Sequence, residues 1–117
     1  MDVIYHLTPI EYFESIPADQ PYRPMDFEHE GFIHSTRGLE QLVIVANRYY
    51  RADPQSMVVL VIDADRVRAE IKNEQAEDGV VYPHIYGPLN RDAIIDILDM
   101  PRLSDGSFQF PDHSSDS

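Results

Sequence analysis

The chain has 117 residues, of which 43% are hydrophobic, so it can form one domain with a single core but has no room for a second. Nine Lys and Arg against 21 Asp and Glu give a formal net charge of −12, which argues against general nucleic-acid binding but not against a small ligand. The lack of cysteine excludes disulfides, thiolate nucleophiles and zinc–cysteine sites. No apolar run approaches the roughly 18 residues of a membrane span, and no basic leader precedes the first strand, so we expect a soluble cytoplasmic protein.

The first thirty residues predict a strand, a short helix and a long loop. Residues 3–7 are apolar and β-prone. The capping-box pattern Thr8-Pro9-Ile10-Glu11 then predicts a helix over residues 9–15, with proline at its first position. Three prolines interrupt residues 16–30, which cannot sustain a helix and are expected to cover part of the surface as an irregular loop.

The middle of the chain predicts the main elements of the core. Residues 31–35 are predicted as a strand, after which Thr36 can cap a helix. Apolar positions at helical spacing predict that this helix is amphipathic and spans residues 38–50. The continuous apolar run over residues 57–62 is typical of a strand covered on both faces, so we expect it in the middle of the sheet.

The last part of the chain predicts a hairpin, one more element and a tail. Residues 70–74 and 80–85 are two possible strands joined by an acidic loop, which favours a hairpin. Periodicity leaves residues 94–100 open between strand and helix, and we favour a strand. Residues 104–117 are predicted as a flexible acidic and polar tail. The domain would therefore span residues 1–103 as one α+β unit with a mostly antiparallel sheet and flanking helices.

Three of the five histidines occur in similar contexts, where one imidazole interrupts an apolar, β-prone run just before a turn or a helix start. They occur in Tyr5-His6, in Gly31-Phe32-Ile33-His34-Ser35-Thr36 and in Tyr82-Pro83-His84-Ile85-Tyr86-Gly87-Pro88. A histidine at a strand end can reach a cleft without burying its charge, so we expect these three to line one pocket. The other two, His29 in a charged loop and His113 in the tail, carry little signal.

The neighbours of these histidines suggest what the pocket binds. Free amides at a helix start after Ser35, with Arg37 nearby, would suit a phosphate or a carboxylate. His84 and Tyr86 can orient hydroxyls or a planar ring. Glu74, on the other predicted strand of the hairpin, is the best-placed carboxylate for base or electrostatic work. The alternative is structural: a helix cap, a solvated arginine and glutamate, a packing tyrosine and core histidines bonded to backbone.

Two other kinds of site can be weighed from the residue patterns. A serine hydrolase is disfavoured because no Gly-x-Ser-x-Gly elbow is present and because His34 and Ser35, adjacent in a strand, point to opposite faces. A metal site built from His6, His34, His84 and Glu74 is chemically possible, but no spacing such as His-Glu-x-x-His requires it. We therefore assign no metal ligand.

The motifs together resemble the DUF952 family of small bacterial proteins. The resemblance covers residues 2–103 and rests on Tyr5-His6, Gly31-Phe32-Ile33-His34-Ser35, Leu60-Val61-Ile62-Asp63, Glu74 and Pro83-His84-Ile85-Tyr86-Gly87-Pro88. It implies a fold similar to that of ADP-ribosyltransferases and RNA 2′-phosphotransferases, which is a split, mostly antiparallel sheet pair around an NAD-binding cleft. NAD is therefore the implied cofactor.

The resemblance also implies roles for individual residues. His6 is similar to the histidine that hydrogen-bonds a ribose hydroxyl, and His34 with Ser35 resembles the motif that shapes the nicotinamide side. Glu74 and His84 compete for the position where many transferases place a glutamate that stabilises an oxocarbenium-like transition state. The expected catalytic residues are His34, His84 and Glu74, and the expected cofactor contacts are His6, Ser35, Arg37 and Tyr86. The implied activity is an ADP-ribosyl or ribose-phosphate transferase, with a non-catalytic nucleotide-binding or protein-interaction module and a histidine metal site as alternatives.

Overall fold

The computed structural model describes residues 1–111, which form an α+β domain with six strands and three α-helices. In chain order the elements are β1 (Val3–Pro9), α1 (Ile10–Ser15), α2 (Phe27–Glu30), β2 (Ile33–His34), α3 (Leu39–Tyr49), β3 (Met57–Asp63), β4 (Glu70–Gln75), β5 (Val81–Tyr86) and β6 (Ile94–Asp99). The predicted α+β class and the predicted hairpin of β4 and β5 are confirmed. Residues 94–100, for which the sequence pattern allowed a strand or a helix, contain the strand that we favoured, β6. No helix within the described residues is long and apolar enough to cross a membrane.

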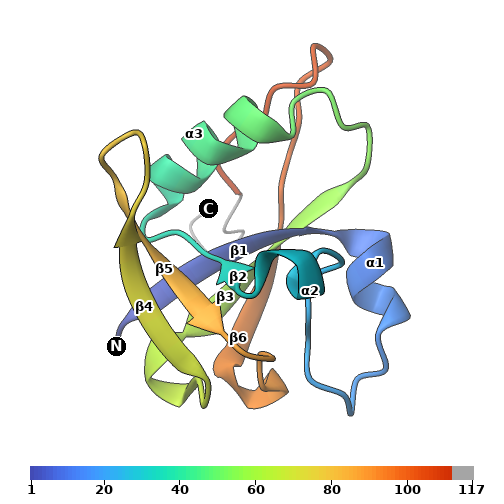
Figure 1. Cartoon of the computed structure of the whole chain (residues 1–117). Helices are drawn as coiled ribbons and strands as arrows, with labels where there is room; N and C mark the ends of the chain where they lie inside the picture. The colour runs from blue at the N-terminus through green and yellow to red at the C-terminus, as the bar shows by residue number, and fades with distance from the viewer. Residues whose placement is uncertain (112–117) are drawn as a thin grey trace.

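The strands form two three-stranded antiparallel sheets, ordered β1-β3-β6 and β2-β5-β4. The sheets meet where Tyr5 of β1 and Thr36, just after β2, exchange two backbone hydrogen bonds of 2.8 Å each. Figure 1 shows α3 packed above β1 and β3, with the β4–β5 hairpin rising beside it.

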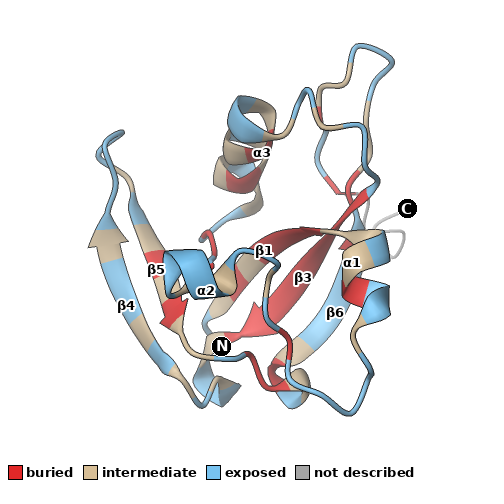
Figure 2. Ribbon diagram, turned by 45° about the vertical axis from the view of Figure 1, so that its right-hand side comes forward, coloured by how far each residue is buried: buried red, intermediate tan, exposed pale blue. Residues whose placement is uncertain are grey.

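Strand β3 lies in the middle of the first sheet and is buried along its whole length (Figure 2). One face, with Leu60 and Ile62, belongs to a core cluster that includes Ile33 and Ile85 of the second sheet. The other face, with Val59 and Val61, packs in a cluster with residues of α3. The predicted central strand is therefore confirmed, because an apolar, β-branched run suits a position covered on both sides.

The predicted capping box at Thr8 was wrong. Strand β1 continues to Pro9, which is itself the N-cap residue, so α1 begins one residue later than expected at Ile10. Thr8 is instead held in the sheet opposite Val58, and its buried hydroxyl lies 2.9 Å from the Tyr22 hydroxyl. Tertiary pairing outweighed a local helix-start pattern here.

The second predicted strand is shorter than expected. Gly31 follows α2 with a left-handed φ of 83°, so strand pairing begins only at Ile33. Gly38 has the same φ value and is the N-cap of α3, so Thr36 does not cap that helix. A β-carbon at either glycine would make this backbone conformation strained.

The domain extends beyond the predicted boundary at residue 103. Phe108 is only 4% exposed and packs in the cluster that includes Leu42 and Ala46 of α3. Its N–H donates to Asn47 Oδ1 at 2.6 Å, which ties the segment to the helix. Residues 112–117, the remainder of the predicted flexible tail, lie outside the described residues.

Candidate functional site

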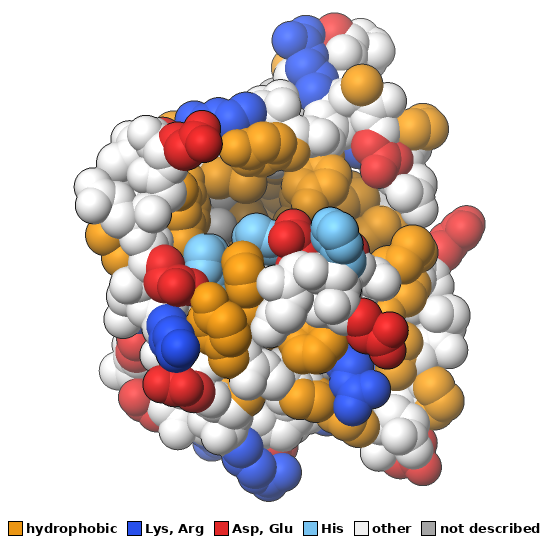
Figure 3. Space-filling view, viewed as in Figure 1, with side chains coloured by type: hydrophobic (Ala, Val, Ile, Leu, Met, Phe, Trp, Pro, Cys, Tyr) orange, Lys and Arg blue, Asp and Glu red, His pale blue; other side chains and the backbone are white. Residues whose placement is uncertain are grey.

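Two adjoining cavities lie where the sheets separate. The smaller, about 290 Å³, is bounded by β1, α3 and the loop around Tyr22. The larger, about 740 Å³, lies between α3, β2 and the tip of the β4–β5 hairpin. Both are lined by Asp26, His34, Thr36, Val45 and Tyr50. Figure 3 shows a hollow with hydrophobic side chains behind and above it and histidine side chains along its lower edge.

The structure brings the three predicted histidines to this hollow. His6 and His34 line the smaller cavity, and His34 and His84 line the larger one. His34 and His84 are directly opposite each other in β2 and β5, with ring centroids 5.4 Å apart. The three side chains thus line two adjoining cavities that share His34, rather than one pocket common to all three. Their roles toward a ligand stay predictions.

His6 forms part of the cavity wall and is almost fully buried, with 6% exposure. Its Nδ1 lies 2.5 Å from the His34 carbonyl oxygen, and its Nε2 lies 2.8 Å from the Tyr22 hydroxyl. Because a carbonyl oxygen only accepts, Nδ1 donates to it, and Nε2 of the neutral ring accepts from the tyrosine. Burial lowers the pKa of His6 from 6.5 to about 4, so the ring is uncharged at neutral pH. His6 therefore connects β1, β2 and the Tyr22 loop.

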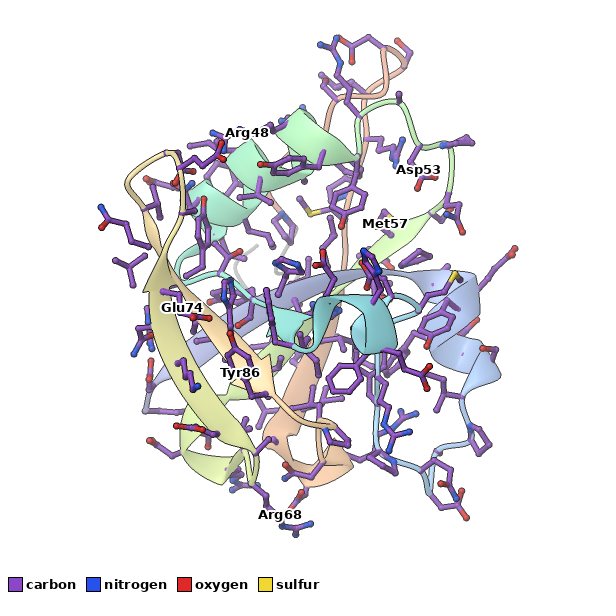
Figure 4. The ribbon with its side chains drawn as sticks, in the orientation of Figure 1. Arg48, Asp53, Met57, Arg68, Glu74 and Tyr86 are labelled. Carbon is purple, nitrogen blue, oxygen red and sulfur yellow. The ribbon has the colours of Figure 1, made fainter. Side chains whose placement is uncertain are left out.

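Glu74, His84 and Tyr86 form a hydrogen-bonded cluster on one face of the second sheet. Alternate residues of β5 place His84 and Tyr86 on the same face, and Glu74 is the diagonal neighbour of His84 on β4. His84 Nδ1 lies 2.8 Å from Glu74 Oε1, and the Tyr86 hydroxyl donates to the same oxygen. Figure 4 shows the Glu74 and Tyr86 side chains close together at this hairpin.

The cluster has the geometry of a histidine oriented by a carboxylate. The hydrogen bond from Tyr86, and then that from His84, lowers the pKa of Glu74, so this carboxylate is ionised at neutral pH. It therefore accepts a hydrogen bond from Nδ1 of His84. Within residues 1–111, the other ring nitrogen, Nε2, has no hydrogen-bond partner. A histidine held in this way can take a proton from a bound group at Nε2.

Phe32 is a site residue to which the sequence analysis assigned no role. Its ring stacks on His84 with centroids 4.1 Å apart and an interplanar angle of 22°, and it also contacts the rings of His34 and Tyr86. Its position two residues before His34 could have predicted this contact, since alternate residues of an extended segment point to the same side. Phe32 restricts the orientation of both histidines.

The predicted anion site after Ser35 does not form within the described structure. The Ser35 hydroxyl lines the larger cavity region but donates to the Pro83 carbonyl oxygen. Arg37 lines neither cavity, since its guanidinium pairs with Asp2 and donates to Asn73. The helix α3 starts only after Gly38, which moves its free amides away from Ser35. Gly38, whose φ is left-handed, separates Ser35 from the start of α3, and the sequence pattern did not predict this conformation.

A histidine metal site is not supported by the arrangement of these residues. Among residues 1–111, no three or more His, Asp or Glu side chains are grouped so that they could hold a metal ion. Both ring nitrogens of His6 have protein partners, and Nδ1 of His84 is bonded to Glu74. The cluster is therefore better described as a hydrogen-bonded one.

Truncation of His34 or His84 to alanine is expected to weaken ligand binding much more than folding. The His34 side chain is 56% exposed, so its loss should cost under about 0.5 kcal/mol of unfolding free energy. His84 is 14% exposed and packs on Phe32, so its loss should cost about 1–2 kcal/mol. Urea unfolding measures the effect of each substitution on folding, and the thermal shift caused by NAD measures its effect on ligand binding. Losses above about 3 kcal/mol in both variants, without a ligand response of the native protein, would mark the histidines as structural.

Comparison with known proteins identifies relatives of this chain. A family model described as "Protein of unknown function (DUF952)" matches residues 7–97. The crystal structure of protein CC0527 from Caulobacter crescentus is similar over 92% of this chain and 93% of that chain, with a TM-score of 0.79 and 25% identity. Its solution NMR structure gives a TM-score of 0.75 and 24% identity, covering 93% of each chain. No curated protein matches the sequence.

Proposed function

The chain belongs to the DUF952 family of proteins of unknown function, and from the geometry of its site we propose that it binds the nicotinamide end of NAD. The proposed arrangement is ADP-ribosyltransferase-like, with the ligand entering the split between the two sheets. The reaction that it would support is transfer of an ADP-ribosyl or related ribose-phosphate group. The observation that supports this proposal is the position of the backbone N–H and C=O of Leu7, which lie on the edge of β1 that faces away from β3.

Leu7 presents a backbone donor and acceptor to the smaller cavity. Because Tyr5 exchanges its backbone hydrogen bonds with Thr36, its polar groups point away from β3. Polar groups alternate in direction along an antiparallel strand, so the N–H and C=O of Leu7, two residues later, point the same way. By this alternation neither group bonds to β3, and no hydrogen bond of Leu7 outside the strand ladder is found within residues 1–111, although Leu7 is only 9% exposed and lines the cavity. Buried backbone groups of this kind require a partner.

A carboxamide is the complementary group, because it offers an N–H and a C=O side by side. Nicotinamide carries this group on a planar ring, and the walls of the smaller cavity include Tyr50, Leu42 and Met57, which suit such a ring. Its lining contains no Lys or Arg among the described residues. We therefore expect the nicotinamide and its ribose to occupy the cavity and the diphosphate to lie outside it.

Residues at the boundary with the larger cavity supply the remaining parts of the proposed reaction, together with Glu74, which lines neither cavity but bonds to His84. His34 and Thr36 lie at the boundary of the two cavities, where the ribose would follow the nicotinamide. Glu74 and His84 act as one pair in this proposal, since the carboxylate orients the ring and His84 Nε2 remains available as a base. The negative charge of Glu74 would also favour an oxocarbenium-like transition state.

Filling the shared wall of the cavities is expected to abolish ligand binding without unfolding the domain. Val45 of α3 is half-buried and lines both cavities, so Val45→Trp would occupy the space of the ring. The matched control is Ile44→Trp, because Ile44 directly precedes Val45 in α3 and is also β-branched, but its side chain is 49% exposed. At ten times its Kd, NAD should stabilise the native protein and the control by about 1.4 kcal/mol, and Val45→Trp not at all.

Thermal shift and nicotinamide release together decide between the proposed activities. NAD and nicotinamide should raise the melting temperature, whereas ADP-ribose, which lacks the carboxamide, should do so much less. Equal shifts with ADP-ribose and NAD would contradict the assigned position of the nicotinamide. Binding of NAD without release of nicotinamide in the presence of nucleophiles would indicate the non-catalytic nucleotide-binding module instead.

A further inference from the structure

The larger cavity carries an excess of negative charge. Its charged lining residues, among those that the structure describes, are Asp26, Glu30, Glu77, Asp78 and Arg48, in addition to two histidines. The one guanidinium is already paired, since Arg48 Nη1 lies 3.0 Å from Asp78 Oδ2. That same carboxylate oxygen also accepts from the Tyr82 hydroxyl at 2.8 Å. Arg48 is therefore engaged, and a phosphate entering this cavity would meet mainly carboxylates.

Two of these carboxylates have no counter-charge in the described part of the chain. Asp26 and Glu77 form no ion pair and no side-chain hydrogen bond within residues 1–111, and Glu30 bonds only to the exposed His34 at 3.2 Å. The effect of this charge reaches the cavity wall. Burial raises the pKa of the Tyr50 phenol, and the charges of Asp26, of Asp53 outside the cavity and of Glu30 raise it further. The cavity thus has an electrostatic preference for cations.

The walls add two features that suit an organic cation over a metal ion. Tyr49, Tyr50 and Tyr82 line the cavity, and tyrosine ring faces attract ammonium and guanidinium groups. Thr36 is 5% exposed and lines both cavities, and its hydroxyl has no hydrogen-bond partner within residues 1–111. A hydroxyl that lines a cavity and bonds to no protein group is available to a hydrogen-bonding ligand at the boundary of the cavities.

We infer that the larger cavity binds an organic cation with an ammonium or guanidinium group, and that this group is the acceptor in the proposed transfer. Only its role as acceptor rests on the proposed function; the binding of the cation does not. In the transfer, the bond from the ribose C1′ to nicotinamide breaks and its electron pair leaves with nicotinamide. The acceptor nitrogen gives one proton to His84 Nε2, and the electron pair that this frees on the nitrogen forms the new bond to C1′.

Isothermal titration of the whole chain, without NAD, tests the cation site. The probes are butylguanidinium, butylammonium and butylurea, of which the last has nearly the shape of the first without its charge. In 0.15 M salt, where long-range attraction is screened, the two cations should bind saturably and butylurea at least about ten-fold more weakly. Equal binding of butylurea, or no saturable binding of either cation, overturns the inference.

A pair of charge-matched variants localises the effect. Glu77→Gln should weaken binding of butylguanidinium about two- to five-fold. Glu70→Gln removes the same charge from the other end of the same hairpin, from an exposed residue that lines neither cavity, and should leave binding unchanged. If the two substitutions weakened binding equally, binding would depend on the overall charge of the protein, and the assignment of the cation to the larger cavity would be wrong. Cation binding without an NAD response would support the cavity assignment while contradicting the proposed function, and NAD binding without cation binding would do the reverse.

Discussion

Replacement of His6 by alanine is expected to lower the free energy of unfolding by about 3 kcal/mol. The imidazole is buried, and its removal leaves a cavity and deprives the His34 carbonyl and the Tyr22 hydroxyl of their partner. It also disconnects β1 from β2 beside the bridge that joins the two sheets. Urea unfolding at pH 7, followed by circular dichroism, measures the loss.

Two controls separate this effect from a general effect of losing a histidine. His29→Ala removes an exposed side chain and should change stability by less than about 0.5 kcal/mol. Tyr22→Phe keeps the packing of the ring but removes the hydroxyl between His6 and Thr8, and should cost about 1–2 kcal/mol. A loss below about 1 kcal/mol in His6→Ala would contradict the structural role assigned to this histidine.

The same histidine is expected to make the domain sensitive to acid. Its pKa is about 4 in the folded protein against 6.5 for the free side chain, so between these values the unfolded chain binds more protons than the folded one. Stability therefore falls as the pH drops from about 6.5 to about 4. At pH 4 this one group should account for about 3 kcal/mol of lost stability, from 1.36 kcal/mol per pKa unit.

The measurement must isolate His6, because protonation of the carboxylates of a chain with net charge −12 also changes stability over this range. We therefore compare the pH dependence of the native protein with that of His6→Gln, which keeps polar atoms in place of the ring and does not titrate. The difference between their stabilities should shrink on acidification, since only the native chain loses the contribution of His6. Parallel pH profiles would show that His6 is not held uncharged by the fold.

Local sequence patterns were sufficient for the elements whose stability depends on neighbours in the chain. The apolar run that became β3 and the helical spacing that became α3 were recognised within a residue or two. Both patterns are periodic and long enough to be read without knowledge of the fold. The hairpin of β4 and β5 was predicted for the same reason. The capping box at Thr8 failed because a short pattern competes poorly with strand pairing.

The sequence by itself determined that the chain is an acidic α+β domain and predicted that His6, His34 and His84 lie at strand ends, because their motifs depend on local β-propensity and turn residues. Only the tertiary structure decided what each histidine can do. The Tyr5–Thr36 bridge places His6 in a wall and turns the backbone groups of Leu7 away from β3, whereas His84 rests on Phe32 and its Nε2 has no partner within residues 1–111. Carboxylates distant in sequence, such as Asp26 and Glu77, gather around one cavity only when the sheets are joined. Such long-range placement depends on packing between elements, which no local pattern encodes.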